Sequence, residues 1–112
     1  MPIGRGRGEL LPGTLDLLVL RTLTLGSLHG YAIAQHIERV SGEIFLIEQG
    51  SLYPTMDRLQ RKGWVKSAWG ETPTGRRARY YSITASGRRQ LGDELARYEL
   101  ASLGIARVLG WA

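Results

Sequence analysis

The sequence predicts a mainly α-helical protein with one small β-hairpin and a long C-terminal helix. Three observations predict this fold class. Apolar residues recur at helical spacing in three segments before residue 63. Two short segments rich in aromatic and β-branched residues, 64–69 and 79–83, then flank a link that contains glycine and proline. Finally, residues 85–110 carry an apolar repeat at heptad spacing.

Length and charge bound the class of partner. A chain of 112 residues is one domain with a single modest core. It has 15 Lys and Arg against 10 Asp and Glu, a net charge of +5. Residues 49–79 alone hold seven cations and two anions, so this stretch carries the whole surplus. A localised positive charge of this kind is what binding to a polyanion requires.

Composition also argues against several classes of protein. The absence of cysteine excludes disulfides and thiolate metal sites, and no segment resembles a signal peptide. The most apolar run, Leu15–Leu28, contains Asp16 and Arg21 and is too short to span a bilayer. His29 and His36 are the only histidines, and no acidic residue lies near them at a ligand spacing. We therefore expect a cytoplasmic protein of bacterial type with no metal, no cofactor and no membrane association.

The first segments predict an arm and a helix. Residues 1–9 are rich in glycine and arginine and have little to bury, so we expect a flexible arm. A Pro-Gly-Thr turn then predicts a helix with Thr14 as its N-cap, ending at Leu23. Leucine and valine occupy nearly every side of this helix, more than one small domain can cover. We expect a second subunit to contact it, through residues such as Leu15 and Leu18.

The next segment, 26–47, predicts a helix and a short strand. Glycines at 26 and 30 end the first helix, and a second helix follows from Tyr31 to Val40 with the buried stripe Ile33, Ala34, Ile37 and Val40. His29, just before it, is expected to cap the helix or contact phosphate. The apolar run 44–47 predicts a brief buried strand.

Residues 49–65 predict a short helix with two different faces. The spacing of Leu52, Met56 and Leu59 predicts one buried stripe, which leaves Ser51, Thr55, Arg58 and Lys62 facing outward. Ser51 is the expected N-cap, with Pro54 in the first turn as the alternative. Gly63 is expected to end the helix in the left-handed conformation. Hydroxyls near the N-terminal turn and cations further along suit a helix that enters the major groove of DNA; a solvated cationic face is the alternative.

The two strand candidates, 64–69 and 79–83, predict a hairpin with arginines at the end of its loop. Such a loop is either a basic wing beside a DNA groove or simply solvated. We expect Trp64 and Trp69 to serve in hydrophobic packing.

Thr84 is the expected N-cap of the last helix, 85 to about 110. A heptad seam runs along it, and Leu100, Leu103 and Val108 add a second apolar stripe. Packing against the first helix covers part of the seam, and dimerisation is favoured for the rest because a monomer would expose a large apolar patch. The residues expected to form the dimer contact are Leu15, Leu18, Leu91, Leu95, Tyr98, Ser102, Ile105 and Leu109.

This order of elements is that of a winged helix-turn-helix domain, 10–84, followed by a dimerisation helix, 85–112. The sequence resembles the PadR family of transcriptional regulators, in its short subgroup with a single C-terminal helix. The resemblance is carried by three segments: Leu28–Ile33, Gly50–Leu59 with Gly63–Val65, and Arg79–Gly87. Met56 and Gln60 stand where the family commonly has Leu and Glu.

The resemblance implies particular roles. Tyr31 would bind phosphate, residues 50–54 would form the groove-entering end of the recognition helix, and Arg76 and Arg77 would form the basic wing. With the outward-facing residues added, the expected DNA-binding set is Tyr31, Gln49, Gly50, Ser51, Tyr53, Pro54, Thr55, Arg58, Arg61, Lys62, Arg76, Arg77 and Arg79. Members of the family bind palindromic operators in double-stranded DNA as homodimers and usually repress. Some short members hold flat aromatic effectors between subunits, a role open here to Tyr98 and Trp111.

Other classes of function fit less well. An enzyme needs a nucleophile with a base, or a metal, and the sequence offers no such set. A winged helix used only for protein contact is the rival, since such a protein would tolerate loss of Arg58, Arg61, Arg76 and Arg77. RNA binding is open from charge alone, although a helix fits the major groove of B-form DNA better.

Overall fold

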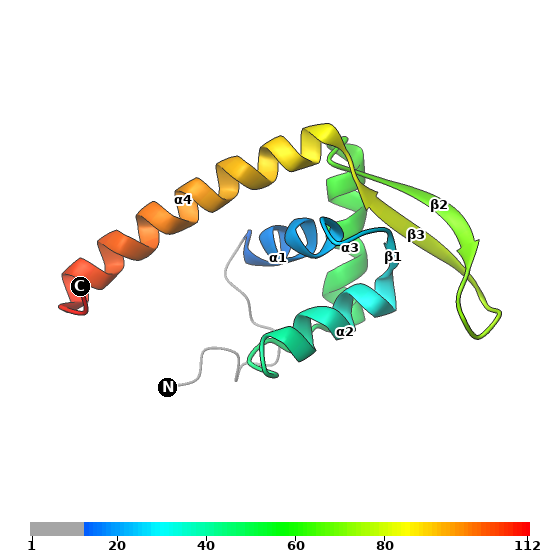
Figure 1. Cartoon of the computed structure of the whole chain (residues 1–112), viewed down its shortest axis with the longest axis horizontal. Helices are drawn as coiled ribbons and strands as arrows, with labels where there is room; N and C mark the ends of the chain where they lie inside the picture. The colour runs from blue at the N-terminus through cyan, green and yellow to red at the C-terminus, as the bar shows by residue number, and fades with distance from the viewer. Residues whose placement is uncertain (1–12) are drawn as a thin grey trace.

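The computed structural model describes residues 13–112, so the arm expected at 1–9 lies outside the described residues. These residues form four helices and three strands, which Figure 1 labels. In chain order they are α1 (Thr14–Leu23), β1 (Leu28–His29), α2 (Gly30–Val40), α3 (Gln49–Arg61), β2 (Val65–Glu71), β3 (Arg77–Ile83) and α4 (Ala85–Leu109). The expected class, mainly α-helical with a small hairpin and a long C-terminal helix, is confirmed.

The core lies among α1, α2 and α3, and it is closed by the base of the hairpin and the first turns of α4. The predicted stripe on α3 is buried as expected, because Leu52, Met56 and Leu59 have almost no exposed surface. Ile33 and Ile37 of α2 are also buried, but Val40 is exposed, contrary to the prediction. Burial of these aliphatic side chains, at about 1.5–3 kcal/mol each, is the main favourable contribution to folding.

The sheet is antiparallel, with the strand order β1-β3-β2. In the ladder between β2 and β3, Trp69 lies opposite Arg79 and Val65 opposite Ile83. The third strand is β1, which pairs Leu28 with Tyr81. This two-residue strand joins the hairpin to the start of α2 and so fixes the hairpin relative to the helices.

The strand predicted at 44–47 is wrong. In the loop between α2 and α3, side chains rather than a neighbouring strand satisfy two backbone N–H groups. The carboxylate of Glu38 accepts from the N–H of Ile47 at 2.7 Å, and Ser41 Oγ accepts from that of Phe45 at 3.2 Å. Only Ile47 of the run is fully buried. The apolar run 44–47 therefore reflects the insertion of Ile47 into the core and not a strand.

Helix caps agree with the sequence in part. Thr84 caps α4, since its Oγ1 accepts from the N–H of Gly87 at 2.9 Å, and His29 caps α2 through Nδ1. The N-cap of α1 is Gly13 in the left-handed conformation (φ 85°), not Thr14. Likewise α3 begins at Gln49, so Ser51 is not its N-cap and Pro54 lies inside the helix. Gly63 ends α3 with φ 78°, as predicted.

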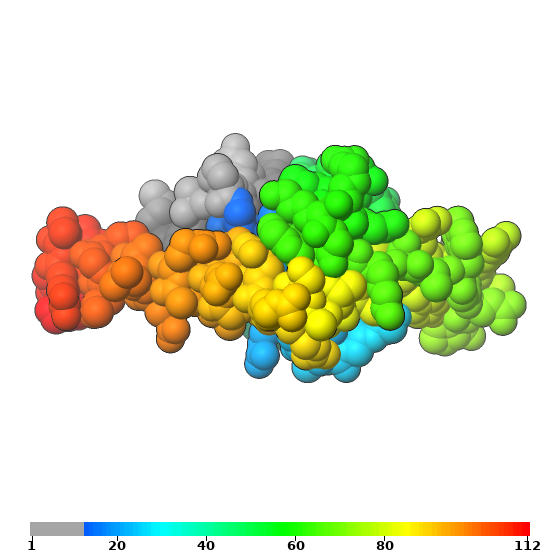
Figure 2. Space-filling model, turned by 90° about the horizontal axis from the view of Figure 1, so that it is seen from above, coloured from blue at the N-terminus to red at the C-terminus, as the bar shows by residue number. Residues whose placement is uncertain are grey.

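Helix α4 is packed on the domain only at its beginning. Its last buried hydrophobic residue is Leu91. Figures 1 and 2 show the rest of the helix extending away from the domain, on the side opposite the hairpin. Among the described helices none is long and apolar enough to cross a membrane.

Candidate nucleic-acid interface

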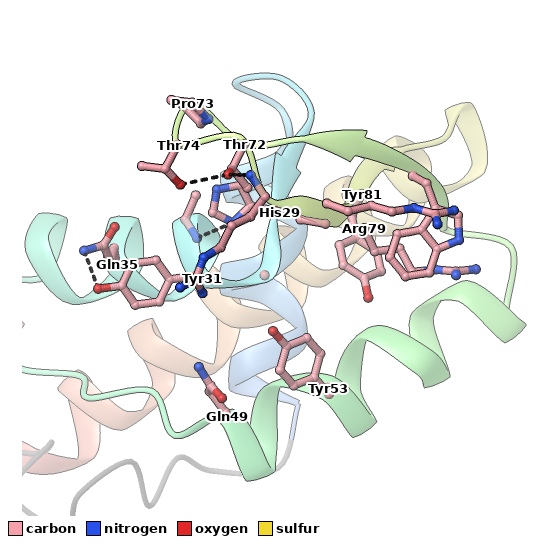
Figure 3. A pocket seen from close by; sticks show the side chains of 16 residues that line it. His29, Tyr31, Gln35, Gln49, Tyr53, Thr72, Pro73, Thr74, Arg79 and Tyr81 are labelled. Carbon is pink, nitrogen blue, oxygen red and sulfur yellow. Dashed lines mark hydrogen bonds between the residues drawn. The ribbon is translucent and has the colours of Figure 1, made fainter.

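The hairpin and the starts of α2 and α3 enclose an open groove of about 1030 Å³ (Figure 3). Its walls bring together residues from distant parts of the sequence, from His29 to Tyr81. They include six residues of the expected DNA-binding set: Tyr31, Gln49, Tyr53, Arg76, Arg77 and Arg79. The fold therefore gathers aromatic, amide and cationic side chains at one concave surface.

The start of α2 forms one wall of the groove. Tyr31 is exposed there, and its hydroxyl accepts a hydrogen bond from Gln35 Nε2 at 3.0 Å (Figure 3). The imidazole of His29 accepts from the N–H of Ala32 at 3.4 Å and packs edge-on against Tyr80. These contacts hold the two rings in place at a helix N-terminus, where the helix dipole favours anions.

The start of α3 forms the opposite wall. Gln49, Gly50, Ser51, Tyr53 and Pro54 are all exposed in its first two turns. No side chain accepts a hydrogen bond from the N–H groups at this helix end. These N–H groups are therefore free of a capping side chain that would compete with a phosphate for them. The first turns of α3 thus present polar groups and a positive dipole end to the groove.

Gly30 allows the two helices to approach each other. A Cβ atom placed on Gly30 would lie only 2.9 Å from the hydroxyl oxygen of Tyr53. The tyrosine ring therefore occupies space that any other residue at position 30 would fill, and the glycine sets the width of the groove at this point.

The hairpin loop is a defined turn. The N–H of Thr72 donates to the carbonyl of Arg76 at 2.7 Å, and the N–H of Gly75 donates to the carbonyl of Thr72 at 2.9 Å. Gly75 has φ 84°, a conformation that favours glycine. Arg76 is exposed at the end of this turn, where a basic wing was predicted.

Two cations at the C-terminal end of α3 are exposed, and each contacts a neighbouring side chain. Arg61 forms an ion pair with Asp57 one turn earlier, and Lys62 Nζ lies 4.9 Å from the centroid of the Trp64 ring. Both side chains remain on the outer face of the helix, as expected, and Trp64 packs against the core.

Arg58 and Thr55, two further members of the expected DNA-binding set, do not line the groove. Arg58 binds both carboxylate oxygens of Asp16 on α1, with N–O distances of 2.8, 2.9 and 3.1 Å. Thr55 is only 6% exposed, so the prediction that it faces outward is wrong. Its hydroxyl instead accepts a 3.4 Å contact from Arg58. Burial raises the pKa of the Asp16 carboxyl above its ordinary value of 3.8, and the Arg58 guanidinium opposes that rise without cancelling it.

The prediction for Trp69 is also wrong, because 57% of its surface is exposed and it lines the groove instead of packing in the core. Trp69, His29 and Gln35 were absent from the expected DNA-binding set. The signal that could have placed Trp69 at the groove is its pairing with a basic residue, because its partner across the ladder is Arg79.

The expected dimer contacts divide into two groups. Leu15 and Leu91 are already buried in the core of the single chain, and Leu18 is half-buried. The remaining members, on the projecting part of α4, are exposed: Leu95, Tyr98, Ser102, Ile105 and Leu109. Trp111, the second candidate for effector binding, is exposed after the helix ends. Within residues 13–112, no three His, Asp or Glu side chains are grouped as metal ligands would be.

Comparison with known proteins agrees with this geometry. In solved structures, the chain is similar to a transcriptional regulator from Clostridium thermocellum (TM-score 0.78, 30% identity, 85% of this chain and 92% of that one). It is also similar to a PadR family transcriptional regulator from Eggerthella lenta (TM-score 0.73, 31% identity, 87% and 82%). The negative transcriptional regulator PadR of Bacillus subtilis is 26% identical over 85 residues, 76% of this chain but only 47% of that protein.

The model of the transcriptional regulator PadR-like family matches residues 19–93. That match covers more than half of the chain, including β1, α2, α3 and the hairpin. This protein therefore belongs to the PadR-like family of transcriptional regulators.

Proposed function

We propose that this regulator binds specific operator sequences in duplex DNA through the groove between α2, α3 and the hairpin. The observation that carries the proposal is the convergence of exposed polar residues of α3 with three hairpin arginines at one concave surface. Helix side chains read base edges, while arginines on a neighbouring loop bind phosphates. The proposed DNA-binding domain is 10–84.

In this docking, the first turns of α3 enter the major groove and the hairpin lies along the adjacent backbone. The proposed contacts are the exposed members of the expected set: Tyr31, Gln49, Gly50, Ser51, Tyr53, Pro54, Arg61, Lys62, Arg76, Arg77 and Arg79. Arg58 and Thr55 are left out, because one is paired with Asp16 and the other is buried. Arg58 links α3 to α1 through Asp16, and Thr55 accepts a contact from Arg58.

We propose that the active form is a homodimer joined through residues 85–112. The support is the projecting half of α4, which exposes Ile105 and Leu109 on the heptad seam and Leu100 and Leu103 beside it. A soluble monomer rarely exposes so many adjacent apolar side chains. Two-fold symmetry then places two recognition helices about 34 Å apart, one turn of DNA, so the operator is palindromic.

Repression in the cytoplasm is the proposed outcome, in line with the negative regulator of Bacillus subtilis to which the chain is similar. A flat aromatic effector would bind between subunits near Tyr98 and Trp111, both exposed on or after α4. Such an effector acts only if it binds one separation of the recognition helices more tightly than another. Quenching of tryptophan fluorescence by proflavine, in the absence of DNA, tests for this site. Because Trp64 and Trp69 also fluoresce, the quenching is compared with that in Trp111→Ala and in Tyr98→Ala, and should be reduced in both.

Fluorescence anisotropy tests the proposed function. The purified protein is titrated into a labelled duplex that covers the region upstream of its own coding sequence and into a scrambled duplex, at several salt concentrations. We expect selective binding to the first duplex that weakens steeply with salt. Equal, weak binding to both would contradict specific recognition there and favour the rival function, docking of a partner protein.

A further inference from the structure

Trp69 is exposed on β2, where its indole contacts two arginines of β3. The guanidinium carbon of Arg77 lies 4.6 Å from the centroid of the ring, and that of Arg79 lies 5.2 Å from it. Trp69 is opposite Arg79 in the ladder, and Arg77 is two residues away on the same face of the sheet. The ring therefore forms a common support for two cations at the edge of the groove.

A second contact restrains Arg79. Its Nε donates to Ser67 Oγ at 2.9 Å, and the Ser67 hydroxyl donates to Gln60 Oε1 at 3.1 Å. These two bonds connect β3, through β2, to the C-terminal half of α3. Because the first bond uses Nε, it leaves the Nη donors of Arg79 for another acceptor.

Within residues 13–112 no ion pair reaches Arg77 or Arg79, although Glu71 lies opposite Arg77 in the ladder. The ion pairs of this part of the chain involve Arg58, Arg61 and Arg97. Two guanidinium groups beside one ring repel each other, and the electron-rich face of the indole offsets part of that repulsion. An anion placed between the two guanidinium groups would remove the remaining repulsion.

We propose, on the basis of the DNA-binding function proposed above, that Trp69 is a positioning residue that holds Arg77 and Arg79 as one site for a phosphate of the DNA backbone. Trp69 acts through the arginines. Holding both side chains before binding reduces the conformational entropy that is lost when the phosphate binds. Arg76, at the loop end, forms no cation–π pair with any ring in residues 13–112 and so has no such support.

NMR of the free protein tests the positioning without DNA. The Nε–Hε groups of Arg76, Arg77 and Arg79 are assigned by substitution, and their order parameters are measured. We expect higher order for Arg77 and Arg79 than for Arg76, a loss of order at both in Trp69→Ala, and recovery in Trp69→Phe, which keeps an aromatic face. Equal order in the wild-type protein and Trp69→Ala would overturn the proposal.

Binding to the upstream duplex tests the use of the site. We expect Trp69→Ala to weaken binding about three- to tenfold. In the Arg77→Ala, Arg79→Ala background, the same substitution should have no further effect, because the groups through which Trp69 acts are absent. Leu25→Ala, which removes an exposed apolar side chain that does not line the groove, is the control and should leave DNA affinity unchanged.

The outcomes separate the two proposals. An equal loss on Trp69→Ala with and without the arginines would mean that the indole contacts DNA itself, and would overturn the positioning role. Failure of the wild-type protein to bind the upstream duplex selectively would count against the proposed function. The order parameters of Arg77 and Arg79 would then decide the positioning role by themselves.

Discussion

The guanidinium of Arg58 on α3 binds both carboxylate oxygens of Asp16 on α1, across 42 positions of the sequence. The Asp16 side chain is only 17% exposed, so this pair is well shielded from solvent on one side. It attaches α3 to α1, the helix on which α4 also packs. Arg58 therefore contributes to the position of α3, and we leave it out of the proposed DNA-binding surface.

Arg58→Ala should lower the free energy of unfolding by about 1–3 kcal/mol, because it leaves a largely buried carboxylate without its partner. The matched control is Arg61→Ala, which breaks an exposed ion pair on the same helix and should change stability by less than about 0.5 kcal/mol. Chemical denaturation measures both. Equal stability of the two variants would show that the pair contributes nothing beyond a surface contact.

The pKa of the Asp16 carboxyl should be raised by its burial. Carboxyl NMR should give a pKa above 3.8 in the wild-type protein and a higher pKa in Arg58→Ala, since the guanidinium that lowers it is gone. Between 3.8 and the folded pKa, the folded state binds more protons than the unfolded state, so the contribution of Asp16 to stability falls as pH rises through this window. Arg58→Lys, which keeps the charge, should show a smaller rise. A pKa below 3.8 would mean that the ion pair outweighs burial.

Gly87 is where α4 meets the hairpin. A Cβ atom there would lie 2.1 Å from the carbonyl oxygen of Trp64, a backbone atom that cannot move away alone. Gly87→Ala should therefore destabilise the protein by about 3 kcal/mol or more. Gly92→Ala is the control on the same helix: nothing lies within 4 Å of its added Cβ atom, and alanine favours the helix by about 1 kcal/mol. Thermal unfolding should move in opposite directions for the two variants.

The elements that the sequence predicted well are those in which burial repeats at a regular spacing. Leu52, Met56 and Leu59 indicated the inner face of α3, and the cap residue Thr84 indicated the start of α4. Each depends on neighbours within a few positions, and local preference and tertiary packing agree there.

Features that depend on distant partners could not be predicted in this way. The strand Leu28–His29 has only two residues and pairs with a strand about 50 positions later, so no periodicity marks it. Arg58 was expected to face outward, and its side chain is 41% exposed, but the sequence does not show that Asp16 lies within its reach. Trp69 was expected to serve in hydrophobic packing, and only the pairing of β2 with β3 shows its cationic partners.

Arg76→Ala should weaken binding to duplex DNA while leaving stability unchanged, because Arg76 is exposed at the end of the hairpin loop. One phosphate contact fewer should reduce the slope of log affinity against log salt by about 1. Arg107→Ala makes the same change of charge near the far end of α4 and should leave the slope unaltered (Figure 1). Identical slopes for both variants and the wild type would mean that the hairpin does not contact DNA as proposed.

Replacement of Leu95 and Ile105 with aspartate should convert the proposed homodimer into a monomer, because both side chains lie on the exposed face of α4 and a dimer would bury the new charges. Sedimentation equilibrium measures the change, and DNA affinity should fall with it, since one recognition helix binds only one half-site. Leu25→Asp is the control: Leu25 is also exposed, but it lies outside α4 and should leave the dimer intact. A product that still sediments as a dimer would mean that the subunits meet elsewhere, and the other face of α4, with Leu100 and Val108, would be the next surface to substitute.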